Sequence, residues 1–103
     1  MSLNSFLKAL REKATIRQIK THSVEKHGNL GRCILEIEVE EIPINQELDF
    51  ILFASQKIGE LVGVIPKYNG RHIKKGIVTL KYAVTGEIGK LLKKESGNNA
   101  NTN

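Results

Sequence analysis

The stretch that decides the fold reads CILEIEVE and runs from Cys33 to Glu40. Apolar side chains occupy every second position from Cys33 to Val39, and acidic side chains follow the same period at Glu36, Glu38 and Glu40. Successive side chains of a β-strand point to opposite faces of the sheet. This pattern therefore predicts a strand that is buried on one face and acidic on the other.

Three more strands are predicted around it. The β-branched residues of 14–21 indicate a strand, and the Gly- and Asn-containing segment 25–31 predicts the turn that makes it antiparallel to the next one. Residues 77–85 alternate like the first stretch and predict a second half-buried strand. The pair Asn69-Gly70 is a strong hairpin signal and predicts a hairpin tip between two strand segments.

The middle of the chain predicts one more strand and a helix. The run LDFILFA, residues 48–54, is apolar enough for a strand that is covered on both faces. Pro43 would break or edge the ladder before it. Residues 56–64 carry apolar side chains at helical spacing, and Ser55 stands in an N-cap position. A short helix is expected there.

The two ends of the chain differ in character. Residues 3–13 have apolar side chains at helical spacing, so they predict an amphipathic helix, capped by Ser2 or Asn4, that closes one end of the core. Residues 95–103 read ESGNNANTN and have nothing to bury, which predicts a disordered polar tail. The expected organisation is a single domain over residues 1–94.

The order of these elements suggests a fold. Five short strands with a helix between the third and fourth do not match a parallel α/β pattern, in which helices alternate with every strand. We predict a mainly β fold with short helices: a small antiparallel five-stranded barrel of the OB type, with an added N-terminal helix. Such barrels bind oligonucleotides on one sheet face and its flanking loops.

The charge of the chain also favours binding to nucleic acid. The net charge is +5, and the two ends of the chain are basic while its middle is acidic. Basic proteins bind phosphate backbones because they release condensed counterions. If the fold brings the basic ends together, their patch is stronger than the net charge implies.

Several classes of function are disfavoured. Cys33 is the single cysteine, so one chain has no disulfide framework, and a reducing, cytoplasmic setting is the default. The apolar runs are too short to span a membrane. The spacing of His22, His27 and His72 matches no usual metal motif, and no activated nucleophile or phosphate loop is found. We therefore expect no enzyme activity and no cofactor.

Residues 49–86 resemble the second half of a bacterial single-stranded DNA-binding protein of the OB-fold type. The matching parts are FILFASQKIGELVGVI, then the turn KKG at 74–76, then IVTLKYAVTG. The resemblance implies single-stranded DNA binding in replication or recombination, in a reduced relative from a mobile element or phage. The chain departs from that family because it has no Trp for base stacking and no acidic residue in 98–103.

The predicted interface centres on the basic hairpin, where cationic side chains would contact phosphates and Tyr68 would stack on a base. Basic residues of the first two strands would extend the groove. The predicted nucleic-acid-binding residues are Arg17, Lys20, Arg32, Lys67, Tyr68, Arg71, His72, Lys74, Lys75 and Lys81.

Two other functions fit the same features. The acidic strand and the basic hairpin could pair across a homo-oligomer or a complex with another protein, which would make the chain a protein-interaction module. A basic β-ribbon could also bind structured RNA. The leading prediction is a non-enzymatic, homo-oligomeric binder of single-stranded nucleic acid with weak sequence preference and steep salt dependence.

Overall fold

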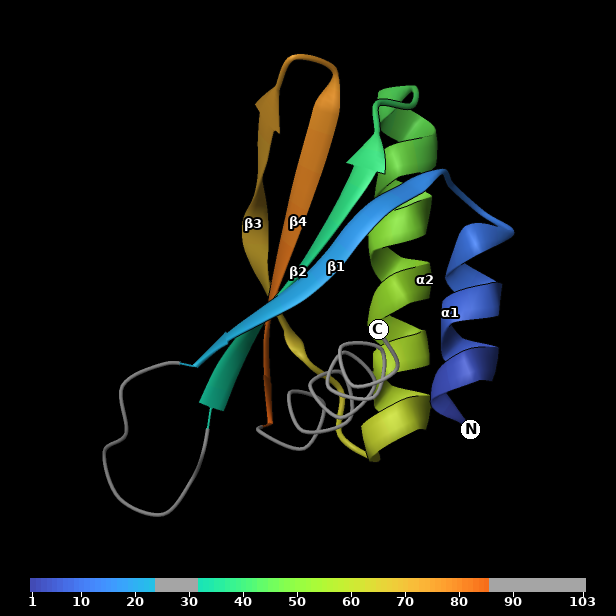
Figure 1. Ribbon diagram of the computed structural model, residues 1–103, viewed down its shortest axis with the longest axis vertical. Helices are drawn as coiled ribbons and strands as arrows, with labels where there is room; N and C mark the ends of the chain where they lie inside the picture. Colours follow the sequence, from blue (N-terminus) through green and yellow to red (C-terminus); the bar gives the residue numbers. More distant parts are fainter. Residues whose placement is uncertain (24–31, 86–103) are drawn as a thin grey trace, which may run out of the picture.

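The computed structural model describes residues 1–23 and 32–85 (Figure 1). The elements follow in the order α1 (Leu3–Arg11), β1 (Ile16–Ser23), β2 (Arg32–Glu40), α2 (Ile44–Val62), β3 (Lys67–Lys74) and β4 (Ile77–Thr85). The strands form one antiparallel sheet in the order β1-β2-β4-β3, and both helices lie on one side of it (Figure 1). The predicted turn over 25–31 and the predicted disordered tail over 95–103 lie outside the described residues.

The sheet formed by the described residues is open, so the predicted closed barrel is wrong, and four of the five predicted strands are described. Its two edge strands, β1 and β3, lie at opposite ends of the strand order and do not pair with each other. Residues 1–23 and 32–85 form four antiparallel strands with two helices on one face. In place of a strand between β2 and β3 there is a helix, so the described part of the chain has no strand that closes a barrel.

The strand predicted over residues 48–54 is wrong because these residues form the middle of α2, which is 19 residues long. Phe50, Ala54 and Ile58 are buried and recur every four residues, so they share one helix face. A short apolar run without alternation fits a buried strand and a buried helix equally well. The helix predicted over 56–64 is the C-terminal part of this longer helix.

Pro43 and Gly63 mark the ends of α2. Pro43 occupies the N-cap position with an extended backbone, and Gly63 ends the helix with a left-handed φ of 82°. The Gly63 N–H donates to the carbonyl oxygen of Gly59 at 2.7 Å. Proline near the start and glycine just past the end are the expected asymmetry of a helix. Ser55 therefore lies inside the helix and does not cap one.

The core lies between the sheet and the helices, and the alternation predicted for β2 and β4 is confirmed. The α1 helix forms as predicted, and its cap is Ser2, whose Oγ accepts a hydrogen bond from the Ser5 N–H at 3.1 Å. The buried apolar side chains are Phe6, Leu10, Cys33, Leu35, Ile37, Val39, Phe50, Ile51, Ala54, Ile58, Val78, Leu80, Tyr82 and Val84.

The hairpin of β3 and β4 turns at Lys75-Gly76, so the tip predicted at Asn69-Gly70 is wrong. Lys75 and Gly76 have φ values of 52° and 77°, which is the geometry of a primed two-residue turn. Asn69 and Gly70 lie inside β3, where the register with β4 shifts between Tyr68 and Gly70. Gly70 takes a φ of 112° at this irregularity. Gly70 therefore allows a β-bulge within β3 and does not form the turn of the hairpin.

Candidate nucleic-acid interface

Both described helices lie on one face of the sheet, and we call the other face the open face. It carries the side chains that alternate with those of the core, since directly paired residues project to the same side. The register places on it Gln18, Lys20 and His22 of β1, Ile34, Glu36, Glu38 and Glu40 of β2, Ile77, Thr79, Lys81, Ala83 and Thr85 of β4, and Lys67, Gly70, His72 and Lys74 of β3.

The half of the open face formed by β1 and β2 is internally neutralised. Basic side chains of β1 meet the acidic side chains of β2 across the strand pair. The ion pairs are Arg17 with Glu40 at 3.1 Å and Lys20 with Glu38 at 3.2 Å and with Glu36 at 3.9 Å, and His22 Nε2 lies 3.3 Å from a carboxylate oxygen of Glu36. Two predicted binding residues, Arg17 and Lys20, are therefore engaged with carboxylates of their own chain.

The half formed by β3 and β4 is basic, and we call it the basic strip: Lys67, His72, Lys74, Lys75 and Lys81. Within residues 1–23 and 32–85, no acidic side chain forms an ion pair with any of them. Lys81 stands opposite Glu36, whose carboxylate already meets Lys20 and His22. The structure thus brings together half of the ten predicted residues.

Tyr68 lies on the other face of β3, toward the helices. Its ring meets the Tyr82 ring edge to face, with centroids 5.5 Å apart and an interplanar angle of 61°. Burial raises the pKa of Tyr68, and the nearby Glu47 carboxylate raises it further. The Tyr82 hydroxyl donates to the Ile51 carbonyl oxygen at 2.7 Å, and burial raises its pKa well above the usual value. The open face consequently has no aromatic side chain among the described residues.

Arg71 also points toward the helices. Its Nη2 donates to Glu47 Oε1 at 2.9 Å, and its Nε pairs with Glu47 Oε2. Glu47 is 1% exposed, on the buried face of α2. Arg71 therefore neutralises a buried carboxylate and is not part of the basic strip. Arg32 begins β2 opposite Thr85, and its side chain lies outside the described part of the structure.

Glu47 directly precedes the run 48–54, and the strand predicted there gives no reason to expect a buried pair with Arg71. In a helix, Glu47 lies three and four residues before Phe50 and Ile51, so its carboxylate falls on the apolar face. A buried carboxylate needs a cationic partner. An acidic residue in register with the apolar face of a helix was the available signal.

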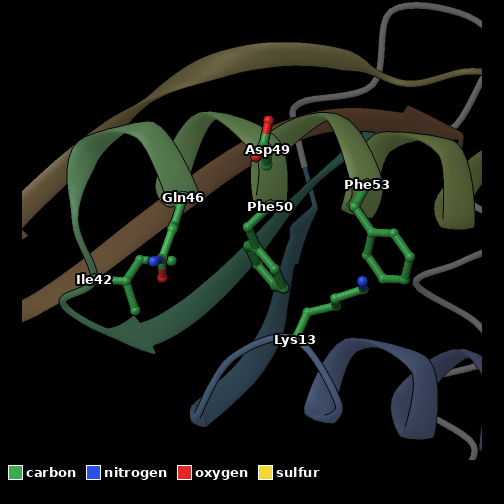
Figure 2. A pocket seen from close by; sticks show the side chains of 6 residues that line it. All are labelled: Lys13, Ile42, Gln46, Asp49, Phe50 and Phe53. Carbon is green, nitrogen blue, oxygen red and sulfur yellow. The ribbon is translucent and has the colours of Figure 1, made fainter.

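A hollow of about 390 Å³ lies between the chain after α1 and the first half of α2. Figure 2 shows Lys13 reaching toward Phe50 and Phe53 of α2. The Nζ atoms of Lys13 and Lys57 lie 5.2 and 5.3 Å from the centroid of the Phe53 ring. Polar groups also line the hollow at Gln46 and Asp49, but no nucleophile stands beside a base there. Both ammonium groups lie over the ring of Phe53, and that of Lys57 also pairs with Glu60 at 3.3 Å.

No group of three His, Cys, Asp or Glu side chains within the described residues is placed to hold a metal ion. None of the helices in the same part of the chain is long and apolar enough to cross a membrane. In comparisons with known proteins, no family model, no curated protein and no solved structure matches this chain. Function is therefore inferred from the geometry alone, and the resemblance to single-stranded DNA-binding proteins stays a prediction.

Proposed function

We propose that this protein binds single-stranded nucleic acid, and single-stranded DNA in particular, through the basic strip. The observation that carries the proposal is the gathering of four lysines and a histidine on two adjacent strands and their turn, without an acidic partner among the described residues. A cluster of unpaired lysines attracts a polyanion and releases its counterions on binding.

The shape of the strip favours one nucleic-acid strand. β3 runs over 8 residues, which at about 3.3 Å per residue gives a length of about 25 Å. The two strands that carry the basic strip, β3 and β4, lie about 5 Å apart. A narrow, elongated row of cations can follow the phosphates of a single backbone, whereas a duplex presents two phosphate rows separated by a groove.

The proposed mode is phosphate contact without base stacking. Tyr68 lies behind the sheet against Tyr82, and the open face has no aromatic platform in the described chain. Phosphate contacts position a protein but read no sequence. We therefore expect weak sequence preference and a strong dependence of affinity on salt.

The experiment is a titration of a fluorescently labelled single-stranded DNA of about 20 to 30 nucleotides, followed by anisotropy at several salt concentrations. With four lysines in contact, the slope of log Kobs against log salt should be about −3. An unlabelled duplex should compete poorly, and a single-stranded RNA arm measures the preference for DNA. Absence of binding at low salt would contradict the proposal.

The alternative function, a protein-interaction module, was predicted to use the acidic strand and the basic hairpin as its interface. β2, the acidic strand, lies inside the sheet between β1 and β4, and its carboxylates already meet Lys20, His22 and Arg17. Pairing of this strand with the basic hairpin of a second copy therefore has no support in the topology. The cytoplasmic setting and the homo-oligomeric state stay predictions.

A further inference from the structure

Large apolar side chains are exposed where α2 runs beside the edge strand β3. Ile44, Leu48 and Leu52 of α2 and Tyr68 and Ile73 of β3 are between 37% and 70% exposed. We call these five residues the edge patch. Single exposed apolar residues are ordinary, but a cluster of this kind marks an interaction surface.

The ion pair between Arg71 and Glu47 holds the two parts of the edge patch side by side. Arg71, which lies between Tyr68 and Ile73 on the helix-facing side of β3, is tied to Glu47 on α2. The Glu47 position immediately precedes Leu48, and Ile44 and Leu52 lie one turn to either side of Leu48. On its other flank α2 contacts α1. The flank beside β3 is therefore the one that no described element covers.

The same place offers unpaired backbone groups. β3 is the last strand in the sheet order and pairs only with β4 within the described chain. An edge strand presents free N–H and C=O groups that can pair with another strand. An added strand would continue the sheet, and its helix-facing side chains would cover the edge patch.

The charges on β3 decide which strand fits. Lys67, His72 and Lys74 project from its open-face side. Antiparallel pairing of β3 with β3 of a second copy would set the Lys67 and Lys74 cations against each other, and like charges across a strand pair are destabilising. The other edge, β1, carries Gln18, Lys20 and His22 on that side, so it offers no acidic side chain to the lysines of β3. Both edges disfavour pairing between copies.

We propose that β3 accepts a β-strand from an acidic partner protein, with acidic side chains alternating with apolar ones. Its acidic residues would meet Lys67, His72 and Lys74, and its apolar residues would cover the edge patch. The chain contains one example of this pairing in its own sheet. β2 has this alternation, and its Glu36 and Glu38 meet Lys20 on the basic strand β1.

This site goes beyond nucleic-acid binding and does not depend on it. It uses the outer edge of β3 and the flank of α2, whereas the basic strip uses the open face. The two share Lys67, His72 and Lys74, so an acidic strand on β3 would neutralise part of the strip. If both sites exist, the partner strand and an oligonucleotide compete.

The test uses the full chain and a labelled synthetic peptide of about nine residues, a usual strand length, in which Glu alternates with Leu, Ile and Val. Anisotropy without nucleic acid measures its affinity. A peptide with Lys in place of Glu should bind about tenfold more weakly or worse, the effect of a few cross-strand charge pairs. A central Pro, which removes a backbone donor, should abolish binding.

Matched variants locate the site. Leu48→Glu should weaken the Glu peptide about tenfold, since it places a charge inside the edge patch. Gln46→Glu adds the same charge to α2, two residues before Leu48 and so about 200° around the helix from it, away from the edge patch, and should leave affinity unchanged. Both positions are exposed, so both variants should fold. Lys74→Glu and Lys8→Glu form a second pair, of which only the first should weaken binding.

Amide exchange by NMR supplies the independent readout, because added strand pairing should slow exchange along β3. Equal affinity for the Glu and Lys peptides would overturn the proposal, as would loss of affinity in both Leu48→Glu and Gln46→Glu. A dimer in sedimentation with slowed exchange along β3 would overturn it too, since the edge would then belong to a second copy. Failure of peptide binding leaves oligonucleotide binding untouched, because each is measured alone.

Discussion

The carboxylate of Glu47 is buried in the core, and Arg71 is the charged side chain that compensates its burial. It is 1% exposed and receives Nη2 of Arg71 at 2.9 Å, with Nε of Arg71 at its second oxygen. Charges out of water cost several kcal/mol unless they are paired in good geometry. Arg71 therefore ties the edge strand β3 to α2, which explains why a residue predicted to bind nucleic acid serves the fold.

Arg71→Met should lower the free energy of unfolding by about 3 kcal/mol, because it leaves the Glu47 charge buried without a partner. Replacing both residues, as in Glu47→Leu with Arg71→Met, should recover most of the loss, since the uncompensated charge is gone. Urea denaturation of the two variants measures both effects. Equal instability of the single and double variants would show that the pair has no such role.

Tyr82 should make the fold sensitive to alkali. Its side chain is fully buried, and burial raises its pKa above the ordinary value of 10.0. Below pH 10 both the folded and unfolded states keep the proton, so the stabilising effect of the neutral phenol is complete. Above pH 10 only the unfolded state releases it, and the free energy of unfolding should fall by about 1.4 kcal/mol per pH unit.

Tyr82→Phe separates this titration from the rest of the protein. The variant should lose about 1 kcal/mol at neutral pH, because the hydrogen bond to the Ile51 carbonyl oxygen is missing. Its stability should then decline less steeply than that of the natural chain between about pH 10 and pH 12. Parallel declines measured by urea denaturation at each pH would contradict this assignment.

At the scale of elements, the β3–β4 hairpin is closed by a suboptimal turn. Lys75 has a φ of 52°, a left-handed conformation in which side chains other than those of Gly, Asn and Asp are strained. Lys75→Asn would create Asn-Gly at the true turn and should raise the free energy of unfolding by about 0.5 to 1 kcal/mol. Thermal or urea unfolding measures the change. A decrease in stability would mean that the turn geometry differs from this description.

Elements are predicted correctly where the pattern of their residues fits only one type of secondary structure. Strict alternation fixed the prediction of β2 and β4, and helical spacing with a serine cap fixed that of α1. The run at 48–54 lacks a period of its own, so the bounding Pro43 and Gly63 were the better signal for α2. The pair Asn69-Gly70 suits a primed turn, but positive φ at Gly70 serves a bulge as well.

The candidate site was predictable in composition but not in geometry. The lysines of 67–81 were identified as a basic cluster, yet β3 reads KYNGRHIK and has no clear alternation. Its irregularity between Tyr68 and Gly70 changes which residues share a face. Only the register with β4 shows that Lys67, His72 and Lys74 lie on one side.

The whole molecule divides its charge unevenly, and net charge alone conceals this. One half of the open face pairs the basic residues of β1 with the acidic residues of β2, while the other half is the basic strip. Cations also occur on the helical side, at Lys8 and Arg11 of α1. If the strip binds nucleic acid, position and not total charge must determine affinity.

The most direct measurement compares two variants of equal charge. Lys67→Gln with Lys74→Gln and Lys8→Gln with Arg11→Gln each remove two of the 16 Lys and Arg residues, so both lower the net charge from +5 to +3. Single-stranded DNA binding is followed by anisotropy across a salt series, and circular dichroism confirms folding. The first pair should weaken binding and reduce the magnitude of the salt slope by about 1.4, the share of two phosphate contacts. The second pair should keep the slope of the natural chain, and equal slopes for both pairs would contradict a localised interface.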